Sequence, residues 1–455
     1  MASDMKPFPQ HPLFLKPIAL ILLIGMSGLG QQADLPILTL DQAIEQAVNG
    51  NSSLKNANLE TSRAARDLAA NRTKRFASLQ VTAYGDQLLT RPSLTFAQGS
   101  LGNYPATGPI PGADQKIEVA RKPVGIVVAS VSQPLTTQYK IHMQLKALEL
   151  SGMATREDER KQRLETIDKV RRAYYDVAKA QSELDSAKAS LPYYQESKRL
   201  ASENLRRETV LESELLQADV QLVKTENAVN EDSDQLAAAL EKLNDLLGRD
   251  IRMQFRVADV KDVDAGATPP EALEARALEN RPDIRKAKLQ VRESEYNSRA
   301  KKAEYIPDVS LGVNYITTTN FGSTLPSNIT AAGLQLSWEP WDWGRRRQEL
   351  AGKRLQEEEA RVAVDATERS ALMEVRNAWR QVESARRQLT LSQASQRQAR
   401  QKLQETQAQI KVEKVLRDSL FSAQSALASA DGQYQQALAA FWSARADLKK
   451  ATGEE

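Results

Sequence analysis

Two kinds of hydrophobic periodicity alternate along this chain, and each of them occurs twice. In two short stretches every second residue is apolar, which predicts strands with one apolar face. The alternating residues are Leu79, Val81, Ala83, Val309, Leu311 and Val313. In the long stretches between them apolar residues recur at three- and four-residue spacing, which predicts amphipathic helices. The chain therefore combines long helices with a few short strands.

A constant shift in numbering superimposes the two occurrences. With a shift of 230, Leu54 falls on Ile284, and with a shift of 205, Leu243 falls on Leu448. The shift decreases inside a Gly- and Pro-rich stretch between Gly85 and Pro134, so the length difference is predicted to be a loop. A repeat of this length indicates a duplicated half-protein rather than a solenoid.

Each repeat is predicted to run in the same order: short helix, longer helix, hairpin and two long helices. The first repeat covers residues 34–248 with its hairpin at 76–134, a linker covers 249–270, and the second repeat covers 271–455 with its hairpin at 306–340. The predicted helices are 39–49, 54–75, 138–206 and 212–247, then 271–280, 283–305, 344–409 and 417–450. The predicted return strands are 124–133 and 331–338.

The longest helices are too long for a globule. About 65 helical residues span roughly 100 Å. Leucines at 4-3-4 spacing in the helix 212–247 predict a coiled-coil seam, and they are Leu236, Leu240, Leu243 and Leu247. Pro192 interrupts the first long helix and has Arg397 as its equivalent, so a kink is expected in the first copy alone.

Composition narrows the classes of function. Aromatic residues make up 5% of the 455 residues, which is typical of long helices and poor for a thick core. The 62 basic and 59 acidic residues are interleaved and almost balanced, which argues against nucleic-acid binding. There is no cysteine, so the chain has neither disulfides nor the lipid-bearing cysteine of a bacterial lipoprotein.

The first 33 residues have the pattern of a secretory signal peptide. Lys6 and Lys16 precede an apolar run of about ten residues, and small and polar residues follow it. A run of that length is short for a bilayer-spanning helix. An N-terminal membrane anchor is the alternative reading.

No catalytic or metal-binding constellation stands out. His142 is the one histidine after residue 33, in a helix rich in Gln and Lys, and no Gly-x-Ser-x-Gly elbow, phosphate-binding loop or HExxH motif accompanies it. We expect a surface histidine, no enzyme activity and no cofactor. Three tryptophans lie at or just after the end of the last strand, and membrane-interface placement is expected for them, with local packing as the alternative: Trp338, Trp341 and Trp343.

Four amphipathic strands are too few to close a membrane barrel, because open edges in hydrocarbon leave backbone groups unpaired. Two chains would supply eight strands, whose barrel interior side chains fill, whereas three supply twelve and leave room for an aqueous lumen. The strand count therefore favours a trimer, in which the long helices continue the barrel as a hollow cylinder with a polar interior.

Several short motifs together resemble the TolC-like outer membrane efflux proteins. They are the turn 280–284 (Asn-Arg-Pro-Asp-Ile), the strand start 306–309 (Ile-Pro-Asp-Val), the strand exit at Pro340 with 341–344 (Trp-Asp-Trp-Gly), and the ending 246–248 (Leu-Leu-Gly). The resemblance covers almost the whole mature chain. It implies an α+β membrane protein: a homotrimer with a 12-stranded barrel in outer-membrane lipid, continued by a periplasmic α-helical barrel. It also implies an exit duct for efflux or type I secretion, docked to a periplasmic adaptor protein and an inner-membrane transporter.

The resemblance also implies two functional regions near the periplasmic ends of the long helices. The family's Val-Gly tip pair is replaced here by Arg207-Glu208 and Val412-Glu413, and the apolar residues beside the tips are expected to dock the adaptor: Val210, Leu211, Val415 and Leu416. Family members often carry acidic side chains at the entrance, and the matching stretch holds Gln404-Glu405. Arg397, Arg400, Gln404 and Glu405 are the candidate constriction. A solvated or interhelical position for Glu405 is the alternative.

Two rival interpretations remain open at this point. A periplasmic coiled-coil adaptor or structural protein would account for the helices but not for four alternating strands that recur with the repeat. A secreted enzyme on a helical scaffold would need site residues that the sequence does not offer.

Overall fold

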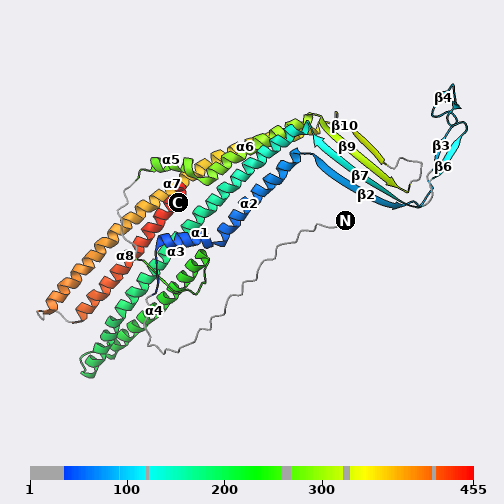
Figure 1. Ribbon diagram of the computed structural model, residues 1–455. Coiled ribbons are helices and arrows are strands. Elements are labelled where there is room, and N and C mark those ends of the chain that lie inside the picture. Colours follow the sequence, from blue (N-terminus) through cyan, green and yellow to red (C-terminus); the bar gives the residue numbers. More distant parts are fainter. Residues whose placement is uncertain are drawn as a thin grey trace, which may run out of the picture.

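The computed structural model describes residues 35–91, 93–118, 122–258, 268–320, 328–411 and 417–454. Figure 1 shows an elongated molecule in which long helices run side by side into a twisted sheet at one end. The predicted signal peptide lies outside the described residues, as does most of the second half of the predicted linker.

The eight helices of the described chain fall into two sets of four, as predicted from the repeat. The first set is α1 (Leu40–Gly50), α2 (Ser52–Arg72), α3 (Thr137–Arg206) and α4 (Glu212–Leu247). The second set is α5 (Pro270–Asn280), α6 (Pro282–Lys302), α7 (Arg345–Lys411) and α8 (Arg417–Thr452). Short 3-10 turns, Thr73–Arg75 and Ala303–Tyr305, follow α2 and α6. Pro192 lies inside α3, which continues through it, and the kink stays a prediction.

Local chemistry explains where these helices begin and end. Thr39 and Gln42 form a reciprocal capping box at the start of α1. Asn51 caps α2 by accepting hydrogen bonds from the backbone N–H groups of Ser53 and Leu54. In the second repeat a proline stands at the first helical position of both α5 and α6, where its missing N–H costs nothing.

One antiparallel sheet joins the two repeats. Its strands are β2 (Ser78–Gln87), β7 (Pro123–Pro134), β9 (Asp308–Thr319) and β10 (Asn328–Ser337). The spatial order is β10-β9-β7-β2, so β7 of the first hairpin pairs with β9 of the second. Among the described strands β2 and β10 are left as open edges.

The register places the alternating apolar residues on one face, as predicted. Leu334 lies opposite Leu311, and Val313 lies between Ala332 and Val131. Leu334 and Leu336 are 71% and 64% exposed in the single chain. Gln335 is on the other face of β10.

The longer first hairpin carries an arm where the repeat comparison predicted a loop. The arm contains β3 (Ser93–Phe96), β4 (Asn103–Tyr104), β5 (Gly108–Pro109) and β6 (Gln115–Glu118). β3 pairs with β6 and β4 pairs with β5, both antiparallel. Figure 1 shows the arm leaving the end of the sheet at an angle.

The helices form one layer, but the helices that make up this layer near the tips differ from those near the sheet. Toward the helix tips α3 packs against α4 and α8, and α8 packs against α7. Toward the sheet α3 packs against α2 and α6, and α6 packs against α7. The layer therefore ends in α4 and α2 on one side and in α7 on the other.

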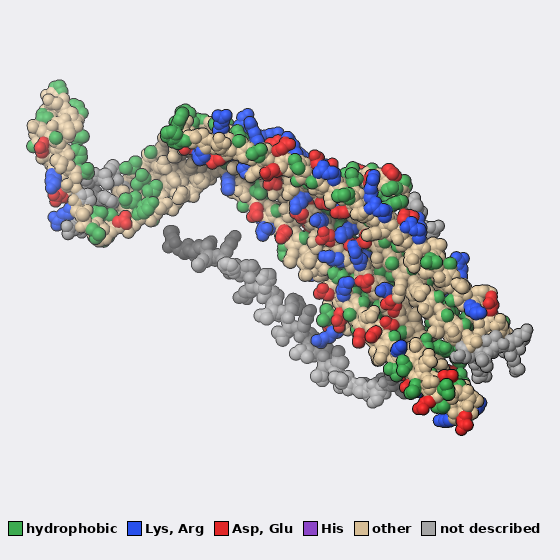
Figure 2. Space-filling view, turned by 180° about the vertical axis from the view of Figure 1, so that it is seen from behind, with side chains coloured by type: hydrophobic (Ala, Val, Ile, Leu, Met, Phe, Trp, Pro, Cys, Tyr) green, Lys and Arg blue, Asp and Glu red, His purple; other side chains and the backbone are tan. Residues whose placement is uncertain are grey.

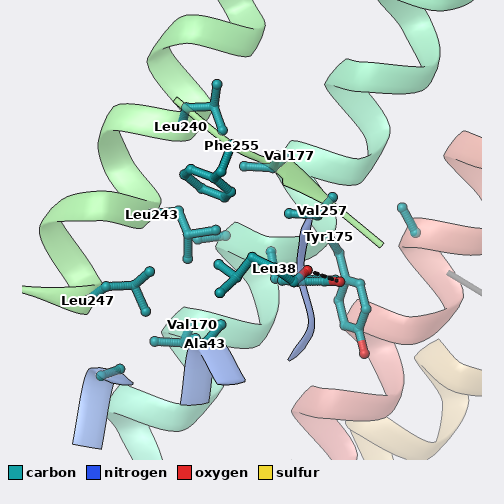
Figure 3. Packing of buried hydrophobic residues seen from close by; sticks show 14 residues of the cluster. Leu38, Ala43, Val170, Tyr175, Val177, Leu240, Leu243, Leu247, Phe255 and Val257 are labelled. Carbon is teal, nitrogen blue, oxygen red and sulfur yellow. Dashed lines mark hydrogen bonds between the residues drawn. The ribbon is translucent and has the colours of Figure 1, made fainter. Parts of the chain in front are cut away.

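The largest apolar cluster lies between α3 and α4, where the predicted leucine seam is buried. Leu243 is fully buried and Leu247 is almost so, both against Val170 and Val177 of α3. A parallel pair of two-residue strands, β1 (Ile37–Leu38) and β8 (Arg256–Val257), covers this seam. Figure 3 shows Leu38, Phe255 and Val257 inserted among these side chains. Part of the segment predicted as a linker is thus folded onto the helices, which the periodicity did not reveal.

The surface divides in the same way as the secondary structure. Figure 2 shows acidic and basic side chains interspersed over the helices, and mainly hydrophobic and uncharged side chains over the strands. No helix in the described part of the chain is long and apolar enough to cross a membrane.

Candidate functional site

The first helix tip is built from a left-handed turn at Glu208. α3 ends at Arg206, and Glu208 has a φ of 58°. The N–H and hydroxyl groups of Thr209 both donate to the carbonyl of Asn204, at 3.0 and 2.9 Å. Glycine is the usual residue in this helix-ending conformation because it has no Cβ. The tip therefore makes a glycine-type turn without glycine.

The predicted docking residues of the first tip are at its surface. Leu211 caps α4 and is 71% exposed, whereas Val210 is half-buried. The corresponding Val415 and Leu416, with Val412 and Glu413, lie outside the described residues. The docking role of Val210, Leu211, Val415 and Leu416 stays a prediction.

The candidate constriction residues Arg397, Arg400, Gln404 and Glu405 are all exposed on the last turns of α7. Arg400 lines a cavity of about 810 Å³ between α3, α7, α8 and β8, together with Pro192 and Arg256. The side chain of Gln401 donates to a carboxylate oxygen of Glu405 at 3.2 Å. Glu405 follows Arg400 by five positions, so their side chains point about 140° apart around the helix. The single chain therefore does not bring these two together.

The three tryptophans are at the junction between β10 and α7. Trp338, Trp341 and Trp343 are 58%, 71% and 90% exposed, and Trp341 and Trp343 meet edge to face with ring centroids 5.8 Å apart. Asp342 fixes the turn by accepting from the backbone N–H groups of Gly344 and Arg346, both at 3.1 Å. Three large exposed indoles thus lie beside the sheet, and their placement at a membrane interface stays a prediction.

A charge network that the sequence reasoning did not single out lies where the helices of both repeats meet. The guanidinium of Arg281 donates to both carboxylate oxygens of Asp283, at 3.0 and 2.6 Å. It also donates to Glu374 of α7 at 2.7 Å and to the carbonyl of Ala451 of α8 at 3.1 Å. One side chain thus ties α6, α7 and α8 together.

The pKa values in this network show which groups are charged. Burial raises the pKa of Asp283, but the Arg281 guanidinium and the N–H of Ile284 outweigh it, so the pKa lies below its ordinary value. Burial opposes the charge on Arg281, yet Asp283 and Glu374 raise its pKa. Both partners are therefore ionised near neutrality.

A second charge cluster joins α3 to α8. Arg172 lies between Asp168 and Asp447, with 3.2 Å from the guanidinium to Asp168, and Lys450 reaches Asp168 at 3.3 Å. Burial raises the pKa of Asp447, as does the nearby Asp168, against the lowering effects of Arg172 and Lys450. Together with the Arg281 network, this cluster lines a cavity of about 260 Å³.

The histidine and the acidic residues of the described chain are the remaining candidates for chemistry. His142 is exposed on α3, as expected for a surface residue. No group of three or more His, Cys, Asp and Glu residues is arranged there to hold a metal ion. The clusters at Arg281 and Arg172 are ion pairs between helices.

The family assignment follows from comparison with known proteins. A profile described as outer membrane efflux protein matches residues 43–249 and 273–454, which are the two repeats. The chain belongs to this family. A protein of Haemophilus influenzae described as uncharacterized is 23% identical over 225 residues, which are 47% of this chain and 49% of that protein. The alignment thus spans about half of that relative's length.

Solved structures share the fold of this efflux-family chain. The outer-membrane channel OprN has a TM-score of 0.72 at 20% identity, with 91% of this chain and 90% of that chain covered. The CmeC outer membrane channel of Campylobacter jejuni has a TM-score of 0.71 at 19% identity, with 91% and 85% covered. CusC has a TM-score of 0.70 at 18% identity, with 94% and 96% covered. The predicted fold class and resemblance are therefore confirmed.

The family motifs acquire physical roles in this structure. Arg281, Pro282 and Asp283 belong to the quoted turn 280–284, and the structure shows them starting α6 and holding the three helices at that level. An arginine that precedes proline and aspartate was the available signal in the sequence. Its partners Glu374 and Ala451 are 93 and 170 residues away, so periodicity did not indicate them.

Proposed function

We propose that this chain forms a trimeric exit duct in the outer membrane, with most of each chain in the periplasm, serving a tripartite efflux pump or a type I secretion system. The observation that carries the proposal is a pair of matching open edges. The sheet ends in the unpaired strands β2 and β10, and the helical layer below it ends in α2 and α4 on one side and α7 on the other. Joining such edges around a threefold axis closes both layers at once.

The free side of α7 has the character of a subunit interface. Its large exposed apolar residues are separated by 7, 11 and 18 residues, which are close to two, three and five helical turns. They are Leu355, Val362, Met373 and Leu391, between 57% and 66% exposed. Buried residues such as Val375 and Leu389 are on the opposite side of the helix. The exposed stripe is thus directed away from the chain's own layer.

The opposite edge of the layer carries matching apolar residues. On α4, Leu216, Val220 and Val223 are 58%, 53% and 47% exposed, and Leu59 of α2 is 65% exposed. Contiguous apolar surface of this kind favours a protein partner. We assign it to α7 of the next copy of this chain.

Cysteine cross-linking tests this interface cleanly because the chain has no cysteine of its own. Leu59→Cys and Val362→Cys lie at similar distances from the sheet on the two edges. A flexible thiol cross-linker should join them between subunits and yield cross-linked dimers and trimers. The matched control is Leu59→Cys with Gln356→Cys, whose exposed side chain is turned about 120° away from Val362. Equal cross-linking of both pairs would contradict the arrangement.

The duct itself is tested on wild-type protein extracted from the outer-membrane fraction. Its mass in detergent should be about three times that of the processed chain, and it should conduct ions in a planar bilayer. A stable monomer or dimer without conductance would support the alternative of a coiled-coil adaptor or structural protein. The four-stranded sheet is the feature that such an adaptor would leave unexplained.

The proposed docking of the adaptor and its transporter rests on the residues at the helix tips. Leu211 is an exposed apolar residue at the end of the helices farthest from the sheet, and Val210 lies beside it. Leu211→Glu should abolish efflux or secretion while trimer level and conductance persist. A charged residue in place of Leu416 should have the same effect on efflux or secretion. Val210 and Val415 complete the proposed docking set. Loss of the trimer in these variants would instead assign the residues to helix packing.

The constriction at the entrance is assigned to the last turns of α7. Glu405 follows Leu391 by 14 residues, close to four turns, so it lies on the side of α7 proposed to meet the next subunit. Exposed ion pairs are worth about 0–1 kcal/mol each, which suits a closure that adaptor binding releases. Arg400→Ala with Glu405→Ala should therefore raise conductance, and Arg397 and Gln404, which lie between these two residues around the helix, complete the proposed constriction. Unchanged conductance in assembled trimers would place the constriction elsewhere.

A further inference from the structure

The outer half of the sheet carries apolar residues on both of its faces. Leu311 and Leu334 share one face of the sheet. Near the helices the other face carries small and polar residues, such as Ser130, Asn314 and Gln335. Toward the loops the same face becomes apolar. Its apolar residues, which we call the collar, are Tyr84, Ile126, Val128, Ile316 and Ile329.

The strand register places collar residues on all four strands, in two neighbouring rows that also hold Thr82 and Thr318. Ile329 lies opposite Ile316, Ile316 lies opposite Val128, and Ile126 lies opposite Tyr84. Tyr84 and Ile329 are 55% and 44% exposed in the chain. On the other face at this height Ala83 and Val127 continue the apolar positions of β2 and β7, whereas β9 and β10 present Tyr315, Thr317, Thr319, Asn328 and Thr330. In the proposed trimer the collar lines the outer mouth of the lumen, where water would otherwise contact it.

The arm beyond the sheet has an exposed apolar face of its own. In the β3–β6 ribbon Leu94 lies opposite Ile117, and Phe96 is on the same face two residues further. Leu94 and Ile117 are 47% and 37% exposed. The other face carries Ser93, Thr95, Lys116 and Glu118. An isolated two-stranded ribbon is marginal in water, so this face gains by being covered.

A bend between the sheet and the arm brings the two apolar faces within reach of each other. The β2–β7 ladder ends at Gln87 and Pro123, and a single backbone hydrogen bond of 3.4 Å, from Leu88 to Lys122, continues it. Leu94 is ten residues after Tyr84, and Ile117 is nine residues before Ile126. Folding the hairpin at this bend therefore places Leu94 beside Tyr84 and Ile117 beside Ile126.

We propose that the arm, residues 93–118, is a lid that folds back onto the collar of its own chain and closes the outer mouth of the duct. The proposal rests on the proposed function, because the collar faces a lumen only in the trimer. Figure 1 shows the arm standing away from the sheet, which is the open position. Apolar contact between two exposed faces favours the closed position, and solute passing outward displaces the lid.

The first test traps the closed position with cysteines in assembled trimers. Tyr84→Cys with Leu94→Cys should lose both free thiols on mild oxidation, measured by labelling with a maleimide-linked polyethylene glycol. Single-channel conductance should fall on oxidation and return with a reductant. The matched control is Tyr84→Cys with Thr95→Cys, which presents the opposite face of the ribbon. Equal oxidation of both pairs, or oxidation without loss of conductance, would overturn the lid, as would a disulfide that links two chains.

The second test opens the lid without touching the sheet. Leu94→Ser with Ile117→Ser should shift the closed-to-open ratio roughly tenfold, seen as longer open times, because the arm loses its apolar contacts. Thr95→Ser with Lys116→Arg is the control on the polar face and should leave open times unchanged. Trimers that conduct equally in both variants would overturn the lid and leave the proposed duct intact. Wild-type protein that forms no conducting trimer would overturn the duct itself.

Discussion

The two repeats solve the same structural problem with different side chains. Asn51 and Arg281 occupy equivalent positions between the short helix and the longer helix of their repeats. The amide of Asn51 donates to the carbonyl of Leu246 at 3.0 Å, and the guanidinium of Arg281 donates to the equivalent carbonyl of Ala451 at 3.1 Å. The contact between the short helix and the end of the last helix is thus preserved although the residue has changed.

Backbone contacts at these helix ends are also shared. A Cβ on Gly248 would lie 2.4 Å from the carbonyl oxygen of Gly50, and a Cβ on Gly453 would lie 3.0 Å from the backbone N of Arg281. Both glycines have positive φ and end their helices. Duplication therefore conserved the backbone geometry, while the side chain at the shared position changed from the amide of Asn51 to the guanidinium of Arg281, which adds ion pairs to Asp283 and Glu374.

The largest expected difference concerns the equivalent leucines Leu243 and Leu448. Leu243 is fully buried under β1 and β8, so Leu243→Ala should lower the free energy of unfolding by about 2–5 kcal/mol. Leu448 is half-buried, and Leu448→Ala should cost clearly less. Chemical denaturation of the detergent-solubilised protein measures both. Equal losses of stability would show that Leu243 and Leu448 contribute equally to packing in their repeats.

The ion-pair side of the comparison depends on Arg281. Arg281→Ala leaves Asp283 and the carbonyl of Ala451 without their partner, and we expect a loss of about 2–3 kcal/mol. This is below the range for fully buried pairs because Glu374 is half exposed. Asn51→Ala, the equivalent change in the first repeat, should cost about 1 kcal/mol through loss of the α2 cap. A larger loss of stability for Asn51→Ala than for Arg281→Ala would contradict the greater contribution assigned to Arg281.

Acid should weaken only the second repeat at this position. The folded-state pKa of Asp283 is below its ordinary value, so its contribution to stability is present above about pH 4 and is lost as the pH falls through the folded value. Asp283→Ser installs the residue found at the equivalent position 53. The difference in unfolding midpoint between wild type and variant should therefore shrink on acidification below about pH 4. A difference that does not depend on pH would remove the ionic explanation.

The smallest expected effect is at the first tip. Glu208 holds a left-handed conformation that costs a residue with a Cβ roughly 1 kcal/mol, so Glu208→Gly should stabilise the protein by about that amount. Thermal unfolding at matched protein concentration measures the change. Glu203→Gly, inside the last turn of α3, is the control and should destabilise by a similar amount. Destabilisation by Glu208→Gly would show that the Glu208 side chain supports the tip.

Much of the fold is encoded in patterns that are local in sequence. The helix and strand bounds follow from periodicity and from caps such as Thr39 and Asn51, and the duplication gives the order of elements. The β1–β8 pair was missed because two residues per strand are too few for a period. The arm was expected as a loop because Gly and Pro mask its short strands.

The candidate sites were less accessible from the sequence. Leu211 was identified at the tip because its position after the long helix is a local property. The network of Arg281 depends on partners more than 90 residues away, and the collar depends on cross-strand register. Alternation alone placed Leu311 and Val313 on one face but did not reveal that the opposite face also becomes apolar near Ile316.

The pairing of β7 with β9 sets the order in which the protein can fold. Val131 pairs with Val313, so the central ladder cannot begin until the second repeat has been synthesised. The helix pair α3–α4 is contiguous in sequence and closes early, because local contacts form faster than distant ones. Until then the first hairpin carries two unpaired strand edges and an apolar face, which exposes it to aggregation. Completion of the four-stranded sheet is therefore a late step in folding.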